Sequence, residues 1–187
     1  MTRLSSEGFR GLVTAMAAAV SANAERLTDL DRAIGDGDHG ANMQRGFDAV
    51  AADLDTLSAK PLPEALKAAG MKLVMTVGGA SGPLVGTFFM TLGKELPEDF
   101  DRKSFTDAFS KAVSAVAARG KSQQGQKTLL DVLYPMQKAL EEGKTVNEIA
   151  GIAQEAADAT IPVLATRGRA SFLGERSIGH IDRKSVV

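Results

Sequence analysis

The feature that most restricts the fold of this chain is the spacing of its apolar residues. Between residues 43 and 57 they recur alternately four and three positions apart, at Met43, Phe47, Val50, Leu54 and Leu57. This spacing places side chains along one face of an α-helix, because the helix repeats every 3.6 residues. We therefore expect a helix that packs this face against a hydrophobic core.

The same period runs through most of the remaining sequence. It predicts further helices over about residues 6–24 and 25–34, then 66–77, 83–96, 105–119, 130–140 and 146–164. No run of alternating apolar and polar residues predicts a β-strand. Short connections favour antiparallel neighbours. The sequence therefore predicts one all-α domain over residues 1–187, an up-and-down bundle or closed ring of about seven or eight helices.

Composition excludes several other classes of protein. The net charge is −1, from 22 basic and 23 acidic residues, so bulk charge indicates neither nucleic-acid nor membrane-surface binding. The absence of cysteine excludes disulfides and thiolate zinc sites and fits a cytoplasmic location. Residues 11–24 resemble a weak signal-peptide core, but Glu7 precedes them and their apolar residues keep helical spacing. No segment is apolar over a length that spans a bilayer.

The most informative stretch is residues 28–47, where Asp31, Asp36 and Asp38 lie among three closely spaced glycines. The glycines match the G-x-G-x-x-G spacing of a dinucleotide-binding loop, but that loop follows a strand. Here the preceding residues read as a helix, and two of the variable positions are aspartates, which repel a bare phosphate. An EF-hand is also excluded, because the sixth and twelfth positions from Asp36 are not glycine and glutamate.

We interpret the three aspartates as ligands of a divalent metal. Hard cations such as Mg²⁺ take oxygen ligands and commonly connect one or two carboxylates to substrate phosphates. Gly35 and Gly37 give the backbone the freedom to bring the carboxylates together. A helix beginning near Ala41 directs N–H groups and its positive dipole end at the same place. A solvated acidic turn is the alternative, but this combination favours a metal–phosphate site.

A second glycine-rich loop, residues 78–83, also leads into a helix. Its backbone N–H groups and the Ser81 hydroxyl suit phosphate oxygens, although an ordinary interhelical turn explains the loop more simply when it is taken alone. In an up-and-down ring, alternate loops lie at the same end. A nucleotide site requires this loop to meet residues 35–41, 120–127 and 166–180, which the sequence does not establish.

Several other polar residues leave two interpretations open. His39 lies inside the acidic loop and is suited either to a phosphate contact or to solvent, and His180 is equally ambiguous. Arg176 suits phosphate, because a guanidinium matches two oxygens, but a surface ion pair is an equal alternative. Lys127 and Thr128 either begin a helix or contact phosphate. The sequence contains no Walker A motif and no nucleophile elbow of the G-x-S-x-G type.

Four motifs occur in order along the chain: LDRAIGDGDHGANM (30–43), GGASGPLVGT (78–87), RGKSQQGQKTLLDVLYP (119–135) and GRASFLGERSIGHID (168–182). Together they resemble the nucleotide-binding L subunit, a DAK2-type domain, of dihydroxyacetone kinases, over nearly the whole chain. The resemblance implies a closed barrel of about eight antiparallel amphipathic helices with the nucleotide at one rim. It also implies that Asp31, Asp36 and Asp38 hold two Mg²⁺ ions that bridge the phosphates.

The resemblance further implies partner subunits. Dihydroxyacetone, or a related short ketose such as erythrulose, is held on a separate K subunit, so this chain alone is not expected to phosphorylate free substrate. The donor is either exchangeable ATP or bound ADP that an M subunit of the phosphotransferase system rephosphorylates. No catalytic side chain is expected, because phosphoryl transfer depends mainly on positioning and charge neutralisation. The implied nucleotide contacts are His39, Gly40, Ala41, Asn42, Met43, Ala80 and Ser81, with Gly120 and Leu129 beside adenine and Arg176 at the phosphates.

The C-terminal residues depart from the family pattern. After the GHID of residues 179–182 the family continues with Pro-Gly-Ala and a segment that covers the nucleotide, whereas residues 183–187 here read RKSVV. We expect this shortened or altered tail to be mobile and to hold the nucleotide more loosely. An alternative function from a different class is a non-catalytic, nucleotide-loaded regulatory or sensor partner.

Overall fold

The computed structural model describes residues 4–186, and its regular elements are all helices. The all-α fold predicted from the sequence is confirmed. The elements are α1 (Ser6–Ile34), α2 (His39–Ala52), α3 (Leu54–Ser58), α4 (Leu62–Thr76), α5 (Ser81–Glu95), α6 (Arg102–Gly120), α7 (Leu130–Glu141) and α8 (Val146–Asp158), followed by two 3₁₀ segments, η1 (Arg169–Ser177) and η2 (Arg183–Ser185).

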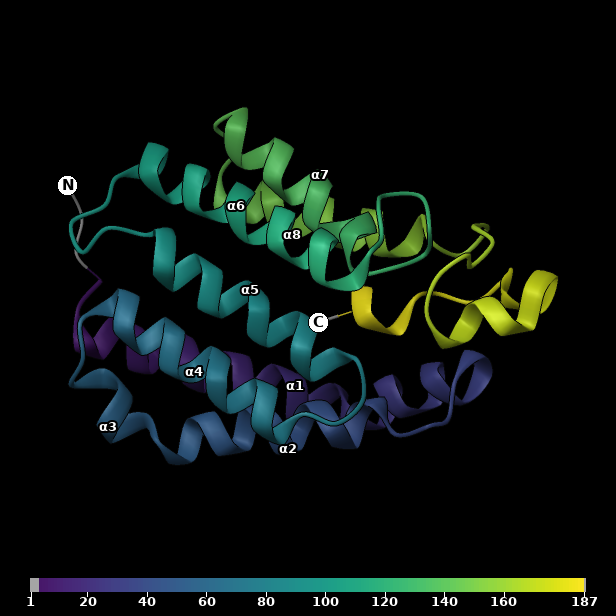
Figure 1. Cartoon of the computed structure of the whole chain (residues 1–187), viewed down its shortest axis with the longest axis horizontal. Helices are drawn as coiled ribbons and strands as arrows, with labels where there is room; N and C mark the ends of the chain where they lie inside the picture. The colour runs from purple at the N-terminus through teal and green to yellow at the C-terminus, as the bar shows by residue number, and fades with distance from the viewer. Residues whose placement is uncertain (1–3, 187) are drawn as a thin grey trace.

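The long helices run alternately up and down the molecule, as Figure 1 shows. Consequently the loops 35–38, 77–80 and 121–129 and the segment after residue 158 all lie at the right-hand end in that view. The short connections around α3, around residues 97–101 and around residues 142–145 lie at the opposite end. The glycine-rich segments are therefore gathered at one end of the bundle.

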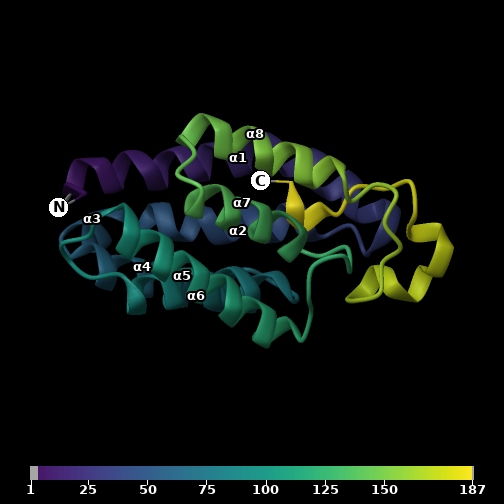
Figure 2. The ribbon, with the colours of Figure 1, turned by 90° about the horizontal axis from the view of Figure 1, so that it is seen from above.

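Two apolar clusters hold the helices together. The larger cluster takes buried side chains from the seven helices α1 to α7, among them Val13, Phe47, Leu73, Leu92, Val113 and Leu133. The smaller cluster joins Leu27 of α1, Val132 of α7 and Ala157 of α8 to Ile181 and Val186. Figure 2, seen from above, shows the C-terminal segment lying between α1 and the last helices. The smaller cluster thus connects the last helices back to the first.

The structure differs from the sequence prediction at several helix boundaries: residues 6–34, predicted as two stretches, form the single helix α1, and α4 begins at Leu62. The apolar stripe over 43–57 is divided between α2 and α3, which are separated at Asp53. The helix predicted over 146–164 ends at Asp158. Pro162 explains this end, because proline has no N–H and disfavours helical backbone in the residue before it. Within residues 4–186, no helix has the length and hydropathy needed to cross a membrane.

Candidate functional site

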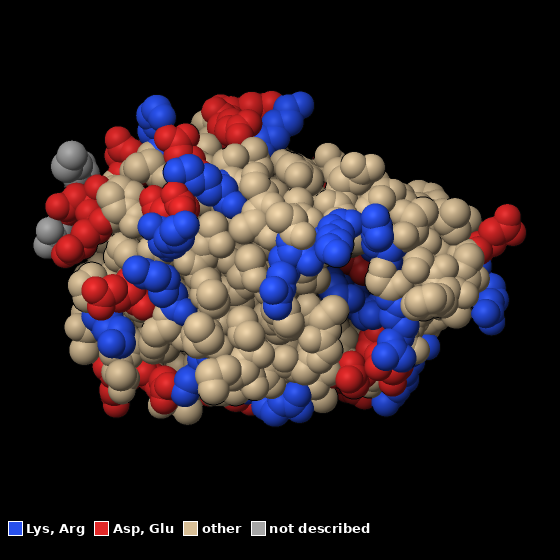
Figure 3. Space-filling model, in the orientation of Figure 1, with Lys and Arg blue, Asp and Glu red and all other residues tan. Residues whose placement is uncertain are grey.

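A cavity of about 560 Å³ opens at the end of the bundle where the glycine-rich loops meet. Its walls come from the acidic loop after α1, the loop before α5, the α6–α7 connection and the C-terminal segment. Figure 3 shows Lys and Arg side chains gathered around a hollow on the right-hand half of the molecule, with acidic atoms among them. The meeting of these four segments, which the sequence left open, is therefore observed.

The acidic loop folds around the carboxylate of Asp31, in the last turn of α1. Asp31 is fully buried, and its Oδ2 accepts hydrogen bonds from the backbone N–H groups of Asp38 (2.9 Å) and His39 (3.1 Å). A Cβ atom at position 35 would overlap Asp31 Oδ1, so the chain passes this point only as glycine. The loop is therefore shaped by the carboxylate that it encloses.

The three aspartates present a set of oxygens that fits a divalent cation. One carboxylate oxygen from each of Asp31, Asp36 and Asp38 lies within 4.8 Å of the others. Among the described residues, Asp31 Oδ1 is a buried oxygen that accepts no hydrogen bond. A buried carboxylate oxygen without a hydrogen bond is costly unless a cation neutralises it. The oxygen-only donor set is the one that Mg²⁺ prefers.

Arginines from the C-terminal part of the chain face these carboxylates. Arg183 Nε contacts Asp31 Oδ1, and both side chains are buried. Arg169 Nη2 lies 3.1 Å from Asp36 Oδ2, where both side chains are partly exposed. Lys184 adds a third cation beside the cluster, and burial lowers its pKa from the ordinary value. The site therefore combines one buried and two exposed carboxylates with a surrounding set of cations.

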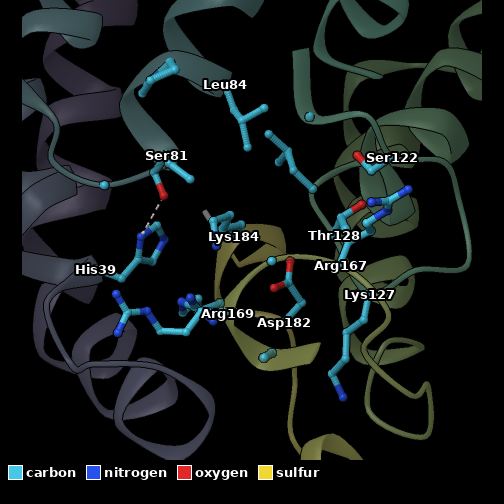
Figure 4. A pocket seen from close by; sticks show the side chains of 18 of the residues that line it. His39, Ser81, Leu84, Ser122, Lys127, Thr128, Arg167, Arg169, Asp182 and Lys184 are labelled. Carbon is cyan, nitrogen blue, oxygen red and sulfur yellow. Dashed lines mark hydrogen bonds between the residues drawn. The ribbon is translucent and has the colours of Figure 1, made fainter. Parts of the chain in front are cut away.

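His39 and Ser81 connect the two glycine loops across the cavity. Ser81 Oγ lies 3.2 Å from His39 Nδ1, as Figure 4 shows. Burial is the main cause that lowers the pKa of His39 to about 4, and the nearby Lys184 and Arg183 lower it further. His39 is therefore neutral at pH 7, so one ring nitrogen carries a proton that can be donated while the other can accept a hydrogen bond.

Lys127 fastens the segment that carries the cavity's arginines. Its ammonium donates to the carbonyl oxygens of Ser177 (2.6 Å), Val163 (3.0 Å) and Ile161 (3.3 Å). Figure 4 shows the side chain extending away from the centre of the cavity. Of the two sequence interpretations of this residue, the phosphate contact is not supported, because the ammonium is already bound by carbonyls of the 161–177 segment.

The structure brings most of the predicted site residues together. The predicted residues that line the cavity are Asp36, Asp38, His39, Asn42, Ala80, Ser81, Gly120 and Leu129. Met43 lies in the core and lines an adjacent apolar cavity of about 280 Å³. Asp31 lies behind the wall, held by the backbone N–H groups of the acidic loop.

Three predicted residues lie elsewhere. Gly40 is buried against α1, where it allows the two helices to approach closely, and Ala41 is exposed on the first turn of α2. Arg176 is exposed on η1 and does not line the cavity. His180, whose role the sequence left open, is also exposed and lies outside the lining.

Sequence reasoning missed two cations of the cavity wall. Arg167 and Arg169 line the cavity, as Figure 4 shows, although they belong to a segment without helical periodicity. The sequence shows two arginines two positions apart, at 167 and 169. The direction in which their side chains point depends on long-range contacts such as those of Lys127. The tail also differs from the expectation of a mobile end, because Arg183, Ser185 and Val186 are buried.

The chain matches known proteins over most of its length. The model of the DAK2 domain family matches residues 33–183. The "PEP-dependent dihydroxyacetone kinase 1, ADP-binding subunit DhaL" of Listeria innocua is 42% identical over 164 residues, which cover 87% of this chain and 81% of that protein. The PEP-dependent ADP-binding subunit DhaL of Escherichia coli is 41% identical over 172 residues, covering 87% and 82%. A PTS-dependent counterpart from Lactococcus lactis is 39% identical over 163 residues, covering 87% and 82%.

Solved structures have the same fold. The dihydroxyacetone kinase of C. freundii in its native form superposes with a TM-score of 0.77 at 23% identity, over 94% of this chain. This chain covers 31% of that longer chain. The complex of the C. freundii enzyme with AMP-PNP and Mg²⁺ gives a TM-score of 0.74. Together with the family match and the identities above, these findings show that the chain belongs to the DAK2 domain family.

Proposed function

We propose that this chain is the nucleotide- and magnesium-binding subunit of a dihydroxyacetone kinase. In this function a phosphoryl group passes from a bound adenine nucleotide to dihydroxyacetone, or a related short ketose, held on a separate subunit. The single observation that carries the proposal is the convergence of carboxylate oxygens from Asp31, Asp36 and Asp38 beside a cavity bordered by glycine loops. The relatives named as ADP-binding subunits support it.

Asp31, Asp36 and Asp38 are the proposed magnesium ligands, and two ions are proposed for the site. Bound magnesium neutralises phosphate charge and orients the phosphoryl group for transfer. Asp31 is held in place by two backbone N–H groups of the acidic loop, so its remaining oxygen is fixed in direction. Asp36 and Asp38 are exposed to the cavity and supply the other oxygens.

The remaining walls suit the other parts of a nucleotide. Ser81 and neutral His39 offer hydrogen bonds to phosphate oxygens beside the start of α5, whose N-terminus favours anions. Arg167 adds positive charge on the opposite wall, and Arg169 adds it beside the acidic loop, where it pairs with Asp36. Leu84, Leu129 and Gly120 provide an apolar border that suits the adenine ring. The role of Arg176 at the phosphates stays a prediction.

The acceptor is proposed to lie on a K-type partner subunit. The second cavity in this chain is apolar and is lined by residues such as Phe47, Phe88 and Leu133, which do not suit a polar triose. A partner that presents the ketose at the open end of the bundle supplies the missing substrate site. An M-type subunit of the phosphotransferase system is the proposed phosphoryl donor when ADP stays bound.

Turnover measurements test whether phosphoryl transfer to the ketose requires the partner subunit. The chain with ATP, Mg²⁺ and dihydroxyacetone should give no triose phosphate alone, and should give it when a K-type subunit is added. Production of triose phosphate is followed by a coupled NADH assay, with K-type subunit alone as the matched control. Robust turnover without the partner contradicts the proposal. Nucleotide binding with no turnover in the presence of the partner supports the regulatory or sensor function instead.

A further inference from the structure

Hydrogen bonds hold residues 182–186 in place beside the acidic cluster. The backbone N–H of Asp182 donates to Thr160 Oγ1 at 2.9 Å, and Ser185 Oγ donates to Asp182 Oδ2 at 2.8 Å. Ser185 Oγ also lies 3.3 Å from the carbonyl oxygen of Thr128. These bonds fasten the segment to the end of α8 and to the α6–α7 connection.

Apolar contacts fasten the last described residue. Val186 is buried and packs in the cluster that contains Leu27 of α1, Val132 of α7 and Ala157 of α8. Figures 1 and 2 show the segment turning back from the end of the molecule toward the bundle. With anchors on both sides, residues 183 and 184 are held facing the cavity. The contacts of Asp182 on one side and of Ser185 and Val186 on the other therefore fix the backbone at Arg183 and the direction of its side chain.

Arg183 reaches the one oxygen of Asp31 that the acidic loop leaves unbonded. Oδ2 is already used by two backbone N–H groups, and Oδ1 is in contact with Arg183 Nε. The exposed fraction of the Arg183 side chain is 7% and that of Asp31 is 1%, so water does not screen the pair. An uncompensated buried carboxylate is strongly unfavourable, and a guanidinium supplies the missing charge.

We propose that Arg183 is a built-in counter-cation that takes the position of a divalent metal at Asp31, so that metal binding requires its displacement. The inference rests on the proposed function, because it takes Asp31 as a metal ligand. Oδ1 is the oxygen of Asp31 left for a metal, and Arg183 Nε contacts that same atom, so the two cations exclude each other there. Arg183 thus neutralises the charge of Asp31 in the absence of metal and weakens metal binding.

Titration of the nucleotide-free protein with Mn²⁺, followed by the electron paramagnetic resonance signal of free Mn²⁺, tests the competition. Arg183→Gln should bind Mn²⁺ at least about tenfold more tightly than the unmodified chain, because a buried competing charge is removed. Arg10→Gln is the matched control: it removes the same charge from an exposed ion pair with Asp55 at the opposite end of the bundle. Its affinity should change by less than about threefold.

Thermal unfolding separates competition from simple damage to the fold. Without metal, Arg183→Gln should melt below the unmodified chain, because Asp31 loses its counter-charge, and saturating Mn²⁺ should raise its melting temperature by the larger amount. Arg183→Lys, which keeps the charge, should bind Mn²⁺ nearly as weakly as the unmodified chain. Equal or weaker Mn²⁺ binding by Arg183→Gln overturns the inference while leaving the proposed metal site intact. Absence of Mn²⁺ binding in every variant overturns both.

Discussion

Replacement of Asp38 by asparagine should abolish magnesium-dependent binding of ADP, with a loss of affinity of more than about 100-fold. Asp38 contributes one of the three carboxylate oxygens that lie within 4.8 Å of one another. An amide keeps the size of the side chain but lacks the negative charge that holds a hard cation against phosphates. The backbone N–H of residue 38, which bonds to Asp31, is unchanged by the substitution, so the acidic loop should keep its shape.

Calorimetric titration of ADP into the protein with Mg²⁺ present measures the effect. Asp29→Asn is the matched control, because it removes the same charge from the exposed face of α1, where Asp29 pairs with Arg32. The control should bind ADP like the unmodified chain, and both variants should keep the helical far-ultraviolet signal. If Asp38→Asn also binds ADP with unchanged affinity, the aspartates do not hold the nucleotide through a metal.

Replacement of Gly40 by alanine should lower the free energy of unfolding by about 2–4 kcal/mol. Gly40 lies in the first turn of α2, directly against α1, and a Cβ atom there would overlap Ala24 O and Thr28 Oγ1. The backbone carbonyl has no rotamer by which to move aside, so the two helices must separate. Because α1 carries Asp31 and α2 begins at His39, their separation should also disturb the acidic cluster.

Urea unfolding followed by circular dichroism measures the change, with Gly11→Ala as the control. Gly11 lies on α1 with no atom within 4 Å of the added methyl group, so alanine there should stabilise the helix by up to about 1 kcal/mol. The two substitutions add the same atom to glycines of adjacent helices and should have opposite effects. Similar stabilities for both variants would show that α1 and α2 do not need their close approach at Gly40.

The helices could be predicted from the sequence because each has its own apolar stripe. The stripe of α2 shows what this signal lacks, since it continues through Asp53 into α3 without marking the break. Whether the glycine loops meet depends on the number of times the chain reverses direction. Periodicity within a single helix carries no information about that number. Only the structure therefore shows that the glycine loops lie at the same end of the bundle.

The acidic cluster could be predicted because its residues are close in sequence, within residues 31–38. The cations that face it come from positions 167–184, and their placement depends on contacts between distant segments. Lys127 binds carbonyls of residues 161, 163 and 177, and Thr160 binds the backbone of Asp182. The tail expected to be mobile is held by these polar contacts and by the burial of Val186. None of these contacts leaves a local pattern in the sequence.

The most direct test of the central claim is calorimetric titration of ADP into the unmodified chain with Mg²⁺ and, separately, with EDTA. The claim is that this end of the bundle binds an adenine nucleotide through divalent metal held by Asp31, Asp36 and Asp38. Carboxylates and phosphates at such short range repel each other unless a cation lies between them. ADP should therefore bind at one site per chain with Mg²⁺ and show no measurable binding in EDTA. Equal affinity in the two buffers, or no binding with Mg²⁺, would contradict the account.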